Sequence, residues 1–137
     1  MALECTLIRE MEPAVPFTVA DGATIEKGSL LILTDPATVA VTTGDTDEII
    51  GVAAEEKIAS DGKTKLSVYM RGIFKGFAGA AGTTAGLAII SDTGTGAANE
   101  LVVADVNSEA VVGIALETAA DTESFLFYLN PVNFNLA

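Results

Sequence analysis

The chain contains the heptapeptide IIGVAAE at residues 49–55 and its near-repeat VVGIALE at residues 111–117. The two copies begin 62 residues apart, and each is followed by an apolar segment, at residues 65–70 and 124–129. In the first of these segments apolar and polar residues alternate, which is typical of a half-buried strand. A glycine inside an apolar strand marks a bulge or a place where another backbone lies close. The sequence therefore predicts a β unit that occurs twice.

An earlier segment extends this duplication. Residues 28–35 and 86–92 each run from a glycine through an apolar stretch to an aspartate, and their glycines are 58 residues apart. Turn signals such as Asp61-Gly62 separate the short apolar runs, and no segment has a convincing helical period. Short strands at regular spacing are typical of sandwiches and barrels. We expect an all-β sandwich or barrel with little helix, built from two pseudo-repeated β halves.

Two features suggest where strands end. Residues 72–77 lead into a Gly/Ala/Thr-rich connector, and a strand is expected at residues 87–90; the longest uncharged run covers residues 76–91. It is too short and too rich in glycine and threonine to span a membrane, and the N-terminus does not have the pattern of a signal peptide. Pro131 lacks a backbone N–H and is expected to end the last strand. No membrane partner is predicted.

The first 16 residues differ from the repeated body. Pro13 and Pro16 favour extended backbone and end any helix before them. Upstream, residues 2–12 fit either a short amphipathic helix or an extended arm, and periodicity leaves both open. We expect an extended N-terminal arm at residues 1–16 and a single β domain at residues 17–137.

Composition excludes several classes of function. Seven basic residues against nineteen acidic ones give a net charge of −12, and no basic cluster is present to neutralise phosphates, so nucleic acid is not a predicted partner. The chain has no histidine, which excludes Ser/His/Asp and Cys/His catalysis and histidine-based zinc sites. A single cysteine excludes an intrachain disulfide. We expect the chain to be made in the reducing cytoplasm of its host.

Carboxylates are the remaining candidates for chemistry. Asp45, Asp47 and Glu48, or Glu55 and Glu56, could form an acid–base pair. Acidic loop residues are normally solvated, and the first cluster lacks the ligand spacing of an EF-hand loop. The sequence predicts no enzyme activity, no metal and no cofactor.

The first half resembles the head decoration proteins of lambda-type tailed phages. The resemblance covers residues 43–77, where the IGVAA strand is followed by an acidic spacer, by Asp61-Gly62, by the LSVY strand and by the RGIF turn at residues 71–74. It implies a trimer that binds the outer face of the mature icosahedral head and stabilises it, with the major capsid protein as partner and the virion as location. It also implies that the N-terminal arm pairs with a capsid strand. The residues that would form this contact are Leu3, Thr6, Leu7, Ile8 and Val15.

Two other functions remain open from the residues alone. A surface-displayed adhesin module would bind a receptor or glycan through loops such as Asp92–Asn99. A carboxylate-dependent hydrolase would use the acidic loops named above. A capsid decoration protein is the leading hypothesis. The strand addition and the three-armed trimer that the resemblance implies are physically consistent with it.

Overall fold

The computed structural model describes residues 3–42, 48–92, 99–104 and 110–133. Within these ranges the chain has eleven strands and no helix, which confirms the predicted all-β class. The strands are β1 (Thr6–Glu10), β2 (Val15–Val19), β3 (Leu30–Thr34), β4 (Thr38–Val41), β5 (Ile49–Ala53), β6 (Lys65–Tyr69), β7 (Gly72–Ala78), β8 (Ala88–Ser91), β9 (Glu100–Val103), β10 (Ala110–Ala115) and β11 (Ser124–Asn133).

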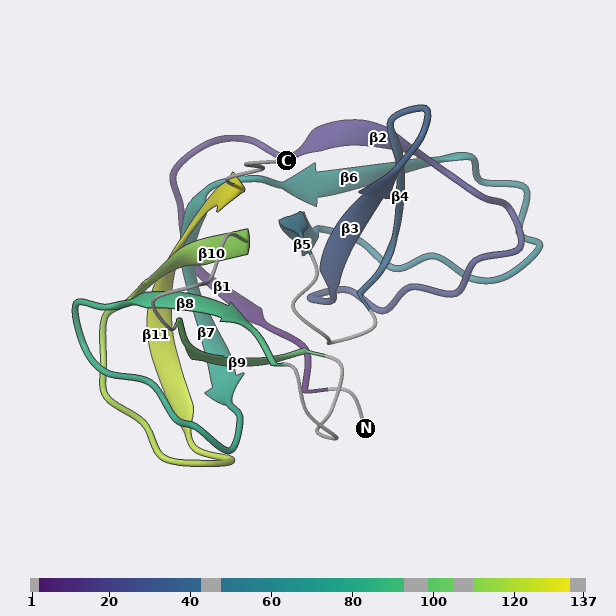
Figure 1. Ribbon diagram of the computed structural model, residues 1–137. Helices are drawn as coiled ribbons and strands as arrows, with labels where there is room; N and C mark the ends of the chain where they lie inside the picture. The colour runs from purple at the N-terminus through teal and green to yellow at the C-terminus, as the bar shows by residue number, and fades with distance from the viewer. Residues whose placement is uncertain (1–2, 43–47, 93–98, 105–109, 134–137) are drawn as a thin grey trace.

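The strands form two closed five-stranded barrels that lie side by side (Figure 1). Strands β2 to β6 make barrel one, in the order β2-β4-β3-β5-β6, and β7 to β11 make barrel two, in the order β7-β9-β8-β10-β11. In each barrel the first strand pairs parallel with the third and antiparallel with the last. Every pairing in barrel one therefore has its counterpart in barrel two, and the predicted duplication is confirmed strand for strand.

The glutamate that ends each heptapeptide has the same role in both barrels. The Glu55 carboxylate accepts a hydrogen bond of 2.8 Å from the backbone N–H of Ser67 in β6. Glu117 accepts one of 2.9 Å from the backbone N–H of Leu126 in β11. These bonds join the end of β5 or β10 to the strand that follows it. The side-chain bond is thus repeated although the loop between the two strands differs in length, with 12 residues from Glu55 to Ser67 and 9 from Glu117 to Leu126.

Two apolar clusters form the core. One fills barrel one with Val19, Ile25, Leu31, Val39, Ala53, Leu66 and Val68. The other fills barrel two and continues onto the outer side of barrel one, where Leu30 and Val52 belong to it. In this second cluster the rings of Phe74 and Phe127 stack with their centroids 6.0 Å apart. Since the second cluster includes side chains of both barrels, the barrels are packed against each other and not merely tethered.

One strand was not predicted and one predicted strand limit is wrong. Residues 72–77, expected to lead into the connector, belong to β7. Strand β11 passes through Pro131 and continues to Asn133. Between Val111 and Gly113 the register with β11 shifts, so that Val112 faces two residues, Asn130 and Pro131. A bulge is one of the few places where a strand tolerates proline, because no ladder N–H is needed there.

Candidate functional site

Strand β1 forms one end of the barrel-two sheet. It pairs antiparallel with β7, from Thr6 opposite Lys75 to Glu10 opposite Gly72. In the described part of the chain β7 is its only strand neighbour, so its other edge presents backbone donors and acceptors outward. Just before β1, the Cys5 backbone N–H donates a 2.8 Å hydrogen bond to a carbonyl of barrel one. The strand is thus fixed to both barrels while one edge stays open, and an open edge is a template for a further strand.

The structure brings together three of the five residues predicted for the capsid contact. Thr6, Leu7 and Ile8 all lie on β1, Leu3 precedes the strand, and Val15 instead begins β2 in barrel one. The register with β7 shifts between Leu7 and Arg9, which places Ile8 in a bulge. The Leu7 side chain packs against the core, whereas Ile8 is 53% exposed. Ile8 is therefore the apolar side chain of β1 that is available to a partner.

A half-open pocket of about 480 Å³ lies beside β1 where the two barrels meet, and among its lining residues are Cys5, Leu7, Val52, Tyr69 and Phe74. Burial, with a smaller contribution from the neighbouring Glu4 carboxylate, raises the pKa of the Cys5 thiol to about 12. This thiol is therefore protonated at neutral pH and is not a nucleophile. The pocket is a packing feature under β1.

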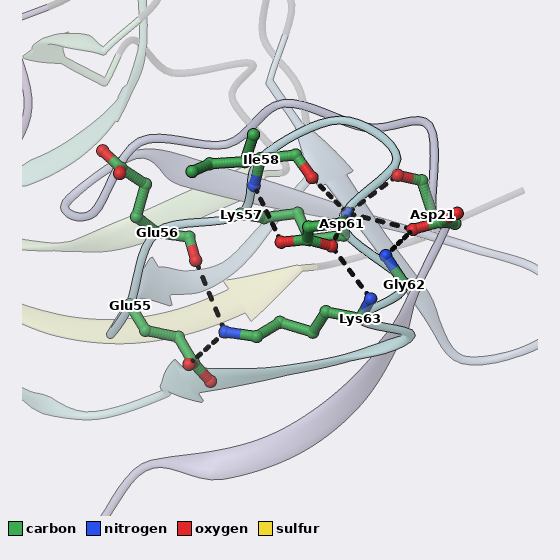
Figure 2. A network of polar contacts seen from close by, with 8 residues as sticks. All are labelled: Asp21, Glu55, Glu56, Lys57, Ile58, Asp61, Gly62 and Lys63. Atoms are coloured by element: carbon green, nitrogen blue, oxygen red, sulfur yellow. Dashed lines mark hydrogen bonds and ion pairs between the residues drawn. The ribbon is translucent and has the colours of Figure 1, made fainter.

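Barrel one contains a buried lysine that sequence analysis does not identify (Figure 2). The Lys57 side chain is fully buried, and its amine donates hydrogen bonds to the backbone carbonyls of Asp21 and Ile58 at 2.8 and 2.7 Å. It donates a third bond of 2.7 Å to the Asp61 carboxylate. All three protons of the amine are therefore used, which satisfies the requirement for a charge inside a protein. The lysine ties the loop after β2 to the loop between β5 and β6.

One of the carboxylates considered for catalysis, that of Glu55, takes part in the neighbouring polar contacts (Figure 2). Glu55 accepts a 2.6 Å bond from the Lys63 amine in addition to the bond from Ser67, and these bonds lower the pKa of its carboxyl. A carboxyl whose pKa is lowered is a poor general acid at neutral pH. Asp45 and Asp47 lie outside the described residues. The arrangement of Glu55 is that of a structural ion pair.

We expect the Asp61 contacts to make the protein acid-sensitive. The Lys57 amine, and next the Lys63 backbone N–H, lower the pKa of the Asp61 carboxyl from 3.8 to about 2. Because the folded pKa is lower, the stabilisation is complete above about pH 4 and is lost as the pH falls through about 2. Asp61→Asn should therefore lose less stability than the wild type over this range in acid unfolding followed by circular dichroism. Glu56→Gln is the control, and parallel curves for Asp61→Asn and wild type would contradict the assignment.

The described residues offer little support for other kinds of site. In the described ranges no three His, Cys, Asp or Glu side chains are grouped so that they could hold a metal ion. The loop proposed for an adhesin, Asp92–Asn99, falls largely on residues 93–98, outside the described residues. No helix in the part of the chain that the structure describes is long and apolar enough to cross a membrane.

The fold is that of an all-β protein built from a duplicated barrel, with β1 as a strand at the end of the barrel-two sheet. The chain belongs to the phage cement protein family, whose profile matches residues 8–129. It is thus a capsid-stabilising structural protein of a bacteriophage virion, and its partners are the capsid proteins of that phage. No curated protein matches the chain. The match supports the predicted class of capsid-stabilising protein and is not specific to the lambda-type decoration proteins.

Proposed function

We propose that the protein binds the outer surface of the mature icosahedral head as a homotrimer, in the manner of lambda-type decoration proteins, and that the open edge of β1 pairs with a strand of the major capsid protein. The observation that carries this proposal is the position of β1 at the end of the barrel-two sheet. An added strand gains main-chain hydrogen bonds along the edge, and side-chain contacts give it specificity. Exposed Ile8 is the side chain of β1 that makes such a contact.

Several weak contacts suffice for this role. Three copies of β1 in one trimer engage the shell together, so the second and third contacts form at high effective concentration. A protein that binds only the assembled, mature shell stabilises it by mass action. No catalytic step is needed, and we propose that the protein is not an enzyme.

The charge of the chain suits an outward position. A net charge of −12 repels packaged nucleic acid and limits non-specific association between particles. The protein would be made in the host cytoplasm and added to the head from outside. Residues 1–16 then act as the capsid-facing segment, with β1 at their centre.

A point variant on β1 tests the proposal better than a truncation. Deleting residues 1–15 would remove Leu7 from the core and the first residue of β2, and so would disturb both barrels. We expect Ile8→Glu to weaken binding to cement-free expanded capsids by about tenfold or more, because a charge on an edge strand opposes pairing. Co-sedimentation over a range of protein concentrations measures the change.

Ile58→Glu is the matched control. Ile58 is 60% exposed and lies in the loop between β5 and β6 of barrel one, so the same substitution there should leave capsid binding unchanged. Equal binding of Ile8→Glu and wild type would remove the β1 mechanism. A wild-type chain that does not bind the cement-free shell would remove the proposed function.

A further inference from the structure

The duplication makes the two barrels comparable face by face. On the outer side of barrel one, β3, β5 and β6 present Leu30, Val52 and Tyr69. The paired positions in barrel two are Ala88, Ile114 and Tyr128, because β8, β10 and β11 repeat the pairings of β3, β5 and β6. We call these surfaces the barrel-one face and the barrel-two face, and the barrel-two face also includes Leu116.

The barrel-one face is covered within the chain. Val52 is only 1% exposed and packs in one cluster with Val112 and Leu129 at an end of barrel two. The ring of Tyr69 meets that of Phe74 edge to face, with the centroids 5.9 Å apart. Strand β5 lies where the two barrels meet (Figure 1). The face of one barrel therefore sits on the end of the next barrel.

The equivalent face of barrel two is open. Ile114, the counterpart of buried Val52, is 42% exposed, and Leu116 beside it is 44% exposed. Gly28 in barrel one and its counterpart Gly86 in barrel two also differ in how closely other atoms approach them. A Cβ added to Gly28 would overlap the Cys5 carbonyl oxygen, whereas one added to Gly86 would meet no atom within 4 Å. On the barrel-two face Arg71 contacts the ring and hydroxyl of Tyr128, whereas Ile114 and Leu116 stay exposed in the described part of the chain.

A surface that could receive the barrel-two face lies at the end of barrel one, and it is open too. The residues of barrel two that receive the barrel-one face are Phe74, Val112 and Leu129, and their counterparts in barrel one are Val15, Ile50 and Met70 by the same register. Val15 is exposed. Ile50 and Met70 line a pocket of about 360 Å³, together with Glu12, Arg71, Asn130 and Pro131. The end of barrel one therefore has an opening, lined by apolar Ile50 and Met70 and by the Glu12–Arg71 ion pair, where the end of barrel two is filled.

We propose that the chain associates head to tail with a second copy of itself, with the barrel-two face of one copy on the Ile50–Met70 opening of the next. The contact repeats between chains the packing that already joins the two barrels within one chain. A heterologous contact of this kind closes into a ring when the rotation allows it. The inference deepens the trimer of the proposed function by naming its contact surfaces, but it requires no capsid and is tested without one.

Sedimentation velocity of the purified full-length chain tests the contact. The wild type should sediment as a multiple of the 14.0 kDa chain. Ile114→Glu should raise the dissociation constant at least tenfold, because it places a charge in the apolar contact. Met70→Glu should do the same from the opposite side, and Ile58→Glu, on an exposed loop outside both surfaces, should not. Circular dichroism confirms that each variant is folded.

An equimolar mixture of the two variants is the most direct test of a head-to-tail contact. In a head-to-tail contact, Ile114→Glu and Met70→Glu each keep one good surface, so an equimolar mixture should form a dimer although neither variant associates alone. A monomeric wild type, an oligomer unaffected by Ile114→Glu, or a mixture that stays monomeric would each overturn the proposal. A monomeric wild type whose capsid binding is weakened by Ile114→Glu would assign this face to the capsid protein instead. The Ile8→Glu binding assay reports on the capsid contact separately.

Discussion

Gly113→Ala is expected to lower the free energy of unfolding by about 3 kcal/mol or more, although it adds a single methyl group. A Cβ at Gly113 would overlap the carbonyl oxygen of Tyr128 and lie 2.9 Å from its carbonyl carbon. Both atoms belong to the backbone of the neighbouring strand β11, so no side-chain rotation relieves the overlap. Strands β10 and β11 would have to move apart, which loosens the barrel-two core. Thermal unfolding should show a loss of about 10 °C.

The first repeat provides a matched test of the same cause. A Cβ at Gly51 would overlap the carbonyl oxygen of Tyr69, so Gly51→Ala should also be strongly destabilising. Gly22 lies in a turn where an added Cβ meets no atom within 4 Å, and Gly22→Ala should stay within about 0.5 kcal/mol of the wild type. A wild-type melting temperature for Gly113→Ala would show that β10 and β11 are not held at this separation.

The close approach of Gly51 and Gly113 to the backbone of the next strand accounts for the glycine in each heptapeptide. The apolar residues of the heptapeptide give a strand pattern that is visible locally, and its glycine marks the contact of one strand with the backbone of the next. The two copies therefore predict both the strands and their duplication. What they do not predict is closure into two barrels, which depends on the parallel pairs β2–β4 and β7–β9 between segments distant in the sequence.

The unpredicted strand β7 and the wrong strand limit at Pro131 have the same origin. Gly76 begins the longest uncharged run of the chain, but it lies inside β7, where a Cβ would come within 2.8 Å of the Phe127 ring. The glycine makes room for an aromatic side chain of a strand about fifty residues later in the chain. Local composition does not distinguish such a packing position from a loop. The bulge at Pro131 likewise depends on the register with β10.

The candidate site could be predicted only in part. The resemblance pointed to residues 1–16, and three of its five contact residues lie on one strand. Sequence reasoning could not show that β1 is held on β7, because that pairing joins segments more than sixty residues apart. Nor could it identify Lys57, which stands in an acidic loop like a solvated lysine. Its burial depends on oxygens from two separate loops.

Lys57→Ala is expected to lower the free energy of unfolding by about 3 kcal/mol. The change removes three hydrogen bonds of the buried amine. The Asp61 carboxylate loses its cation, and the backbone carbonyls of Asp21 and Ile58 keep one donor each, the N–H of Ser60 and that of Asp61. It also leaves a cavity where the lysine chain was packed. Urea unfolding measures the loss. Lys63→Ala is the control: its amine also binds a carboxylate in this loop, but it is partly exposed and should cost less than about 1 kcal/mol.

Barrel two shows that the lysine is not required by the fold itself. The bridge of Ile25 with Lys57 is repeated there by Thr83 with Ala119, so a buried alanine occupies the lysine position. The surrounding loop, rather than the barrel, therefore determines the cost of removing the amine. Lys57→Met, which keeps most of the packed volume, should recover part of the loss in Lys57→Ala. Equal stability of Lys57→Ala and wild type would show that the network contributes nothing to folding.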